Sequence, residues 1–359
     1  MSKRLFWVVV ALLVGGLIVL SSASIAVSLE RYGTPYYYVQ RQLLVGILPG
    51  IVALLFFRRF SYRHLRPLAL PGLIGTLVLV GLVFVPSLGL TINGARNWLS
   101  LGAFSFQPSE FLKLALVIYL AAWLSKGGER LRQWQFGLVP FAIMIGIVGI
   151  FLAVQPDLGG LSIVLAIAAA VYFIAGASTK QVAAIAIAGV LLLGSFAALS
   201  PERWDRITTT FHRSADVQGS GYQLNQALVA IGAGGLGGVG LQESTQKFGF
   251  LPEPIGDSIF AVLVEELGLI GGMFTVGLFG LLAYTLIGIA RRAPDTFGSL
   301  LVSGMFVWIM VQATVNMAAI TGIGPLTGVT LPFISYGGTS MVSLLAGIGI
   351  VLNVANTKS

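Results

Sequence analysis

The strongest constraint on the fold is a series of ten long apolar runs separated by polar stretches. A helix needs about 20 apolar residues to cross the roughly 30 Å of hydrocarbon in a bilayer. Only 9% of the 359 residues are charged, whereas a soluble domain has about 25% and needs that charge to cover its surface. This excludes a soluble enzyme, a disordered chain and a nucleic-acid-binding domain. It predicts an all-α polytopic membrane protein.

Each run is interpreted as one transmembrane helix of a single integral membrane domain that occupies residues 1–359. The eighth run is long enough to tilt or to extend beyond the membrane. The ten predicted spans are about 5–29, 40–57, 67–86, 109–125, 137–154, 159–176, 180–199, 258–290, 297–320 and 332–355.

The distribution of Lys and Arg predicts the orientation of these spans. The net charge is +8, but the basic residues alternate between loops instead of forming one patch. Thirteen of them fall on the side of the N-terminus, and three fall in the short loops of the other side. Because short cytoplasmic loops carry the excess of Lys and Arg, both termini are predicted to be cytoplasmic. The basic balance therefore indicates topology in a lipid bilayer and not a nucleic-acid partner.

One large extracytoplasmic loop, residues 200–256, is predicted between the seventh and the eighth span. Most acidic residues outside the spans fall on this same outer side, so we expect the chemistry of the protein there. Within the loop, residues 221–241 are apolar and rich in glycine. Such a stretch is typical of a re-entrant or interfacial segment, which must be buried in protein or line a water-filled cavity.

Asp257 is the candidate for catalysis. It follows Pro252 and Pro254 and stands where the large loop meets the eighth apolar run. A carboxylate at the membrane surface, beneath a large loop, could act as a general base. The simpler alternative is an N-cap that stabilises the start of the helix, and one Asp can fill both roles.

Charged residues within the predicted spans are costly and are either paired or functional. Glu110 and Lys113 are three residues apart on one helix face, which predicts an intramembrane ion pair. Glu265 and Glu266 lie two turns beyond Asp257, and on an ideal helix they cannot both face the same cavity as Asp257. We expect these two acids to form a buried, hydrogen-bonded group that packs helices.

Basic residues of the outer side are candidates for binding an anionic head group. An arginine suits a diphosphate because its planar fork donates to two oxygens at once. The alternative for each of these residues is a solvated loop face. The candidates are Arg96, Arg203, Arg206, Arg213 and Lys247.

No metal site can be assigned from the sequence. There is no cysteine, and the two histidines, His64 and His212, fall on opposite sides of the predicted membrane. Outer carboxylates could hold a hard divalent cation such as Mg²⁺ or Mn²⁺, but no spacing specifies one. No other cofactor is predicted.

Three stretches of the chain resemble the SEDS family (shape, elongation, division and sporulation), which includes RodA, FtsW and SpoVE. The stretches are 93–113, 221–268 and 324–340. The last reads Gly-Pro-Leu-Thr-Gly-Val-Thr-Leu-Pro-Phe-Ile-Ser-Tyr-Gly-Gly-Thr-Ser, which is close to a signature of the family. Together with the ten spans, the resemblance covers essentially the whole chain.

The resemblance implies a peptidoglycan glycosyltransferase of the bacterial cytoplasmic (inner) membrane that acts in cell shape or division. Its substrates would be lipid II, a disaccharide-peptide on undecaprenyl diphosphate, and the growing glycan strand. Its partner would be a class B penicillin-binding protein, which is a transpeptidase. The catalytic Asp of the family corresponds to Asp257, its functional Trp to Trp98, and its paired Glu and Lys to Glu110 and Lys113.

The chain departs from the family pattern beside the Asp. Many members have His-Thr-Asp-Phe where this chain has Ile255-Gly256-Asp257-Ser258, so no imidazole stands next to the carboxylate. The stretch 244–247, Ser-Thr-Gln-Lys, resembles FtsW more than RodA. A choice between elongation and division is left open.

These residues fit an inverting glycosyl transfer. Asp257 would take the proton from the 4-hydroxyl of an acceptor sugar, whose oxygen attacks the anomeric carbon of a donor on lipid diphosphate. One base suffices, because a second carboxylate as nucleophile belongs to retaining enzymes. Loop Arg and Lys, or a divalent cation, would stabilise the leaving diphosphate. Two alternatives stay open: a lipid II flippase or transporter, and a non-catalytic scaffold for a transpeptidase.

Overall fold

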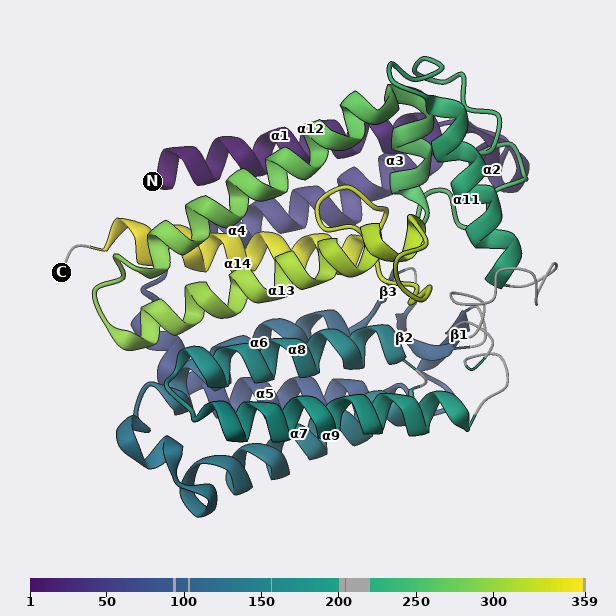
Figure 1. Ribbon diagram of the computed structural model, residues 1–359. Coiled ribbons are helices and arrows are strands. Elements are labelled where there is room, and N and C mark those ends of the chain that lie inside the picture. Colours follow the sequence, from purple (N-terminus) through teal and green to yellow (C-terminus); the bar gives the residue numbers. More distant parts are fainter. Residues whose placement is uncertain (93–94, 103, 156, 200–203, 205–219, 358–359) are drawn as a thin grey trace.

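The computed structural model describes residues 1–92, 95–102, 104–155, 157–199, 204 and 220–357. Long helices run side by side in a bundle, and both termini lie at one end of it (Figure 1). We call the opposite end the site end. It carries a small β-sheet, a helix outside the bundle (α11) and the loop formed by residues 321–337 (Figure 1).

Helices make up most of the regular structure of the described residues. Short π-helical turns precede α4 and α7, namely η1 (Gln42–Ile47) and η4 (Trp134–Leu138), and 3-10 turns form η2 (Tyr62–His64) and η3 (Gly128–Arg132). The α-helices are α1 (Ser2–Ala23), α2 (Ile25–Tyr32), α3 (Tyr37–Arg41), α4 (Leu48–Arg59), α5 (Leu65–Leu82), α6 (Pro108–Leu124), α7 (Val139–Val154), α8 (Leu158–Ile174), α9 (Thr179–Ala198), α11 (Ser220–Gly234), α12 (Ile259–Ala290), α13 (Thr296–Ile320) and α14 (Gly338–Asn356).

Each of the ten apolar runs contains a helix of the bundle. Among the described residues, eight helical segments are long and apolar enough to cross a membrane. They are Ser2–Ala23, Tyr37–Arg59, Tyr62–Leu82, Trp134–Val154, Thr179–Ala198, Ile259–Ala290, Thr296–Ile320 and Gly338–Asn356. The helices α6 and α8 are shorter, with 17 residues each. The tenth run begins its helix later than expected, because residues 332–337 belong to the loop before α14.

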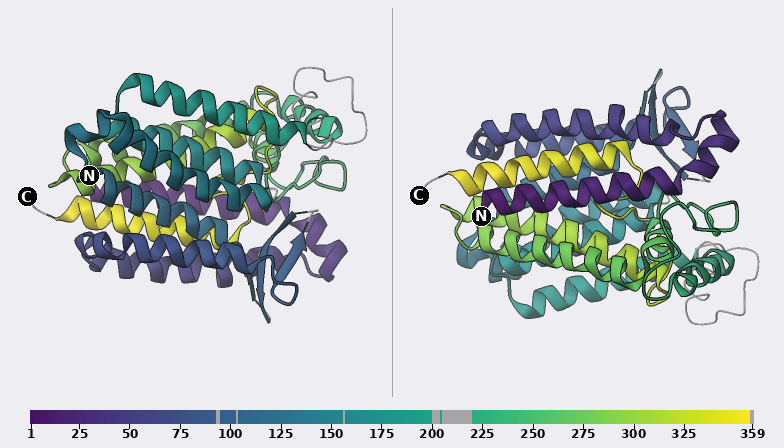
Figure 2. Two further views of the ribbon diagram at one scale, coloured as in Figure 1. Left: turned by 90° about the horizontal axis from the view of Figure 1, so that it is seen from below. Right: turned by 90° about the horizontal axis from the view of Figure 1, so that it is seen from above.

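The centre of the bundle is formed by α13 and α14. α14 packs against α4 and α6, and α13 packs against α12, α8 and α6. By contrast, α9 lies at the edge of the molecule (Figure 2), where Val190 and Leu191 are 70% and 67% exposed. A helix that is apolar on its outer surface as well fits contact with lipid.

The expectation of a wholly helical fold is wrong at residues 89–106. The strands β1 (Gly89–Ile92), β2 (Ala95–Leu101) and β3 (Phe104–Phe106) form an antiparallel sheet in chain order. β1 ends in the β-branched residues Thr91 and Ile92, and β3 contains two phenylalanines, which are residue types that favour a pleated, half-buried surface. The prediction missed them because it rested on apolar runs long enough to span a membrane, and these strands have at most seven residues.

α12 is broken, although the run 258–290 suggested one long helix. At Gly268 the backbone has φ 70° and ψ −173°, outside the helical region. Residues 234–240, which begin with the last residue of α11, lie against this break. Their amides donate to the carbonyls of Glu265 (2.9 Å) and Glu266 (3.1 Å), and their carbonyls accept from the amides of Leu269 and Ile270. The backbone groups that the break frees are therefore paired, as burial requires.

Candidate active site

Asp257 lies at the site end, in the turn that leads into α12. The helix begins at Ile259, and Ser258 occupies the N-cap position without a side-chain capping bond. The N-cap role considered for Asp257 is therefore wrong, because the turn continues one residue past it. Its partly buried side chain makes other contacts instead.

The Asp257 carboxylate is oriented by α11. The side-chain amide of Gln223 donates to Oδ1 of Asp257 at 3.2 Å and to Oγ of Ser258 at 3.0 Å. Oγ of Ser258 lies 3.5 Å from the same carboxylate oxygen and donates to it. The direction of the carboxylate thus depends on how α11 packs against α12.

The loop 321–337 holds the backbone just before Asp257. Oγ of Ser335 donates to the carbonyl of Gly256 at 2.7 Å, and the amide of Tyr336 donates to the carbonyl of Ile255 at 2.9 Å. Ser335 Oγ in turn accepts from the amide of Leu331 at 2.7 Å. This is the stretch that resembles the family signature, and its polar residues fasten the turn that carries Asp257.

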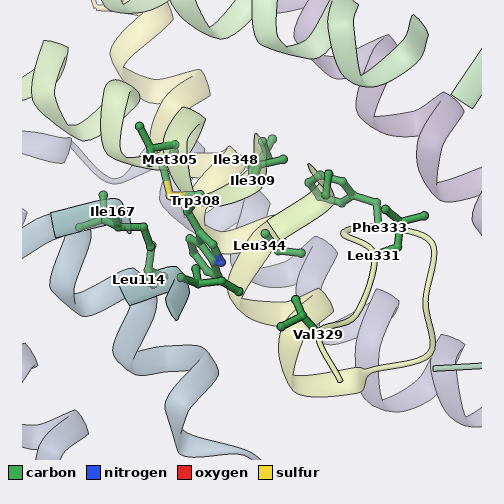
Figure 3. Packing of buried hydrophobic residues seen from close by; sticks show 14 of the residues in the cluster. Leu114, Ile167, Met305, Trp308, Ile309, Val329, Leu331, Phe333, Leu344 and Ile348 are labelled. Atoms are coloured by element: carbon green, nitrogen blue, oxygen red, sulfur yellow. The ribbon is translucent and has the colours of Figure 1, made fainter. Parts of the chain in front are cut away.

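The same loop is anchored in the apolar core. Val329, Leu331 and Phe333 belong to one buried cluster with Trp308 and Leu114 (Figure 3). A loop that buries its apolar side chains has little freedom to move. It can therefore serve as a rigid support for Asp257.

A narrow gap beside Asp257, too small to admit a water molecule, is bounded by residues of α13 and of the loop 321–337. Its walls include Asp257, Asn316 and Thr327. Oδ1 of Asn316 and Oγ1 of Thr327 are buried and have no hydrogen-bond partner among the described residues. These two oxygens are out of reach of a substrate, but the carboxylate of Asp257 is only partly buried. It can therefore accept a hydrogen bond from a hydroxyl group, which is what a general base for an alcohol requires.

The predicted ion pair within the bundle is confirmed. Nζ of Lys113 lies 2.7 Å from Oε1 of Glu110, and both side chains are nearly inaccessible. The ammonium also donates to Oε1 of Gln312 at 3.1 Å and lies 5.3 Å from the centre of the Trp308 ring. A buried ammonium with these three partners is compensated, as a charge at this position must be.

Glu265 and Glu266 are buried and hydrogen-bonded, as expected. Oε1 of Glu265 accepts from the amide of Thr245 at 3.1 Å, and its Oε2 accepts from Oγ of Ser244. Glu266 accepts from Oγ of Ser22 and from Nζ of Lys247. The two acids fasten residues 244–247 of the large loop to α12 and α1.

Lys247 is therefore not a surface residue of the loop. Its side chain is fully buried, with Nζ 2.8 Å from Glu266 and 2.9 Å from Ser22. This placement contradicts the expectation of a head-group ligand. The sequence could not reveal it, since the pairing depends on how the loop folds back onto α12.

The other predicted ligands divide into two groups. Arg96 and Trp98 lie on β2, and β2 lies at the site end (Figure 1). The guanidinium of Arg96 donates to the carbonyl of Val85 at 3.1 Å, which holds the sheet to the end of α5. The remaining candidates, Arg203, Arg206 and Arg213, lie outside the described residues.

The described residues contain no group of three or more His, Cys, Asp or Glu that could hold a metal ion. The hydrogen bonds described at Asp257 include those from amide and hydroxyl groups of Gln223, Ser258 and Asn316. The arrangement is suited to orienting one carboxylate.

The sequence prediction missed three residues that build the site, namely Gln223, Asn316 and Ser335. All three carried a signal, and that of Ser335 is its place in the family-like stretch 324–340. Asn316 stands four residues after Gln312 in an otherwise apolar run, and a polar side chain there needs a buried partner. Gln223 opens one of the family-like stretches, but only the packing of α11 shows that it meets Asp257.

A helical bundle with an apolar exterior and a polar site at one end defines a polytopic membrane protein with a candidate active site near the ends of its helices. More specifically, the chain belongs to the family of FtsW, RodA and SpoVE. The family model, described as "Cell cycle protein", matches residues 3–359.

Named relatives match the chain over nearly its full length. It is 38% identical over 359 residues to stage V sporulation protein E of Bacillus subtilis, covering 99% of this chain and 97% of that one. It is also 38% identical over 350 residues to the probable peptidoglycan glycosyltransferase FtsW of Thioalkalivibrio sulfidiphilus, covering 96% and 87%.

Solved structures share the fold. The rod shape determining protein RodA of Thermus thermophilus has a TM-score of 0.72 and 29% identity, with 98% of this chain and 95% of that chain covered. A chain from a peptidoglycan synthase complex, described as coordinating polymerization and crosslinking, has a TM-score of 0.80 and 31% identity, covering 98% and 96%.

Proposed function

We propose that this chain is a peptidoglycan glycosyltransferase that polymerises lipid II into β-1,4-linked glycan strands, with Asp257 as the general base. The observation that carries the proposal is the arrangement of Asp257. Its carboxylate is oriented by Gln223, its backbone is clamped by the loop 321–337, and its side chain is only partly buried. The names of the relatives support the same activity.

The proposed reaction is a single inverting displacement. The proton of the acceptor 4-hydroxyl passes to the carboxylate of Asp257, and the oxygen forms a bond to the anomeric carbon of the donor. The bond from that carbon to the lipid diphosphate breaks, and the diphosphate leaves with the electron pair. Inversion of an α-linked donor gives the β-1,4 linkage without a covalent enzyme intermediate.

Positive charge is needed where the diphosphate leaves. We propose Arg96 and Trp98 of β2 as substrate contacts, together with Arg203, Arg206 and Arg213 of the large loop. A divalent cation could supply the same charge. Lys247 is not part of this proposal, because its ammonium is buried against Glu266.

The proposed topology has ten spans, with both termini in the cytoplasm and the site end outside the inner membrane. Three observations support it: each apolar run contains a helix, both termini lie at the same end (Figure 1), and Lys and Arg are enriched in the short loops on the side of the termini. The lipid tail of the substrate would remain in the bilayer while its sugars react outside.

The proposed partner is a class B penicillin-binding protein. A transpeptidase that crosslinks new strands is the natural companion of a polymerase. The likeness to a chain from a complex that coordinates polymerization and crosslinking supports this assignment.

The test is polymerisation of labelled lipid II by purified protein, with and without a class B partner. Asp257→Asn keeps the size of the side chain and should abolish detectable polymer, since a general base contributes about 10²–10⁴-fold. Glu243→Gln is the matched control, because Glu243 is an exposed carboxylate of the same loop. Wild type and this control should both give long strands.

Two results would contradict the proposal. Polymer from a folded Asp257→Asn variant would remove Asp257 as the base. An inactive wild type, even with its partner, would remove the glycosyltransferase itself. A lipid II translocation assay would then separate a flippase from a scaffold.

A further inference from the structure

Three polar or amphipathic side chains form a ladder along one face of α13. Trp308, Gln312 and Asn316 follow one another at intervals of four residues, which places them on the same side of the helix. Their exposed fractions are 0%, 1% and 2%. Buried amides on a helix that is otherwise almost entirely apolar require an explanation.

The lower rung of the ladder is Gln312. Its Oε1 accepts from Nζ of Lys113 at 3.1 Å and from the indole Nε1 of Trp308 at 2.8 Å. Two donors on one oxygen fix the orientation of the amide. Its Nε2 therefore points toward the loop and donates to the carbonyl of Thr330 at 3.0 Å.

The upper rung is Asn316. Its Nδ2 donates to the carbonyl of Val329 at 2.7 Å and to the carbonyl of Asp257 at 2.8 Å. The two amides thus hold consecutive carbonyls of one loop segment. Asn316 also ties that segment to the backbone of Asp257 itself.

The opposite side of the loop segment is closed by α8. A Cβ atom added to Gly159 would lie 2.6 Å from the carbonyl oxygen of Thr327 and 2.7 Å from Cγ2 of Val329. Residues 327–330 are therefore wedged between α8 and the ladder. A shift of either amide would have to move this segment.

We propose that Gln312 and Asn316 are positioning residues, which rests on the proposed transferase function. They fix Val329, Thr330 and the carbonyl of Asp257, and so make the placement of the carboxylate depend on the Glu110–Lys113 ion pair. The ion pair sets the orientation of Gln312, which holds the loop. Asn316 links the loop to the backbone carbonyl of Asp257. A displacement of about 1 Å at a reacting group can cost about 10²-fold in rate.

A role in stability alone explains the ladder poorly. The ladder does contribute to stability, because a buried carbonyl that loses its donor is left unsatisfied at a cost in free energy. The hydrogen bonds of this ladder also converge on two carbonyls of a loop and on the carbonyl of Asp257. Convergence on the site is what a positioning role requires.

The first test compares kcat and KM for lipid II in wild type and in Asn316→Leu. We expect kcat to fall by at least about tenfold, while KM stays within about threefold, because the base moves and the substrate contacts remain. The matched control is Ser343→Ala. Ser343 is also fully buried, but among the described residues its hydroxyl donates only to the carbonyl of Ser340 within α14, so kcat should be unchanged.

The second test uses the isosteric variant Asn316→Asp and a pH series. A protonated carboxyl can donate one hydrogen bond to a carbonyl, whereas the ionised form repels both carbonyl oxygens. The ratio of variant to wild-type activity should therefore fall as the pH is raised. A ratio independent of pH would contradict the role of the amide as donor.

The third test is a double-mutant cycle for the link to the ion pair. The neutral pair Glu110→Gln with Lys113→Met should lower kcat in wild type but have little further effect in the Gln312→Met background. If the fold reductions in kcat from the neutral pair and from Gln312→Met multiply in the combined variant, the ion pair does not act through Gln312. That result would overturn the link.

Hydrogen exchange of backbone amides tests the positioning role of Gln312 and Asn316 without a polymerisation assay. Amides of residues 326–336 should exchange at least about tenfold faster in Asn316→Leu and in Gln312→Met than in wild type or Ser343→Ala. Unchanged exchange, or a wild-type kcat in Asn316→Leu, overturns the positioning role. An inactive wild type would count against the proposed function alone, since the exchange result still decides on the ladder.

Discussion

The ammonium of Lys247 is held in a fully buried ion pair with Glu266, 19 residues further along the chain, and Ser22 of α1 completes its surroundings. A pair of this kind is costly to form, because both charges leave water. Once formed, it is sensitive to the loss of one partner. At the residue scale, the attachment of the large loop thus depends on a few compensated charges.

Lys247→Met is therefore expected to destabilise the protein by about 3–5 kcal/mol, because Glu266 would keep a buried charge without its partner. Thermal unfolding in detergent would measure this. Lys180→Met is the control, since Lys180 is exposed and surface changes stay within about 0.5 kcal/mol. Equal unfolding temperatures for the two variants would contradict the structural role of the pair.

Asp157 is a second residue whose environment predicts a measurable effect. It caps α8 by accepting from the amide of Gly160 at 2.7 Å. Burial raises the pKa of its carboxyl above the ordinary value, and the hydrogen bond from Gly160 offsets part of that rise. The folded protein therefore disfavours the charged form.

A raised folded-state pKa gives stability that is present below the unfolded pKa, near 4, and is lost as pH rises through the folded value. Asp157→Asn keeps an oxygen for the cap but cannot ionise. Its unfolding temperature relative to wild type should therefore increase as pH is raised from about 4 toward neutrality. A difference that is constant with pH, or that decreases, would falsify the assignment.

At the scale of elements, the break in α12 and the segment 234–240 form one unit. The break opens backbone groups that the segment then satisfies. Because the segment begins with the last residue of α11, the position of Gln223 on α11 depends on this unit. The orientation of Asp257 is thus connected to a helix break eleven residues further along the chain.

Gly268→Ala should disrupt that unit. Gly268 has φ 70°, which is unfavourable for residues other than glycine, and an added Cβ would collide with the carbonyl of Leu236. We expect a loss of more than about 1 kcal/mol and faster proteolysis within 234–240. Gly277→Ala in the same helix has open space around it and should be neutral or stabilising by up to about 1 kcal/mol. A Gly268→Ala variant that is stable and resists proteolysis would show that the unit formed by the break and the segment 234–240 is dispensable.

At the scale of the whole molecule, the two ends of the bundle differ. Both termini lie at one end, and the sheet, α11 and the loop 321–337 lie at the other (Figure 1). The hydrogen bonds that the structure describes at Asp257, with Gln223, Ser258 and Asn316, lie at the site end. A bundle built this way can keep its helices in lipid while one face reacts in water.

The sidedness can be tested with single cysteines, because the native chain has none. Glu243→Cys at the site end should react with a membrane-impermeant thiol reagent added to intact spheroplasts. Gln133→Cys at the end of the termini should react only after permeabilisation, since both positions are exposed. Labelling of Gln133→Cys in intact spheroplasts would reverse the proposed orientation.

The site could be predicted in part. Glu110 and Lys113 were paired correctly because they lie three residues apart on one helix, where spacing alone brings side chains together. Lys247 was misassigned because its partner lies on another element. Asn316 was missed because its two acceptors are backbone carbonyls of Val329 and Asp257, which no sequence pattern marks.

The sequence by itself determined that this is a membrane protein and where its long apolar helices lie. That is so because about 20 consecutive apolar residues are a local property, and in lipid they leave the backbone few alternatives to a helix. Only the tertiary structure decided where polar groups meet. Gln42 reaches Ser335 across 293 residues, and Asn316 reaches Asp257 across 59. Such contacts depend on the packing of whole helices, which the local pattern of residues does not encode.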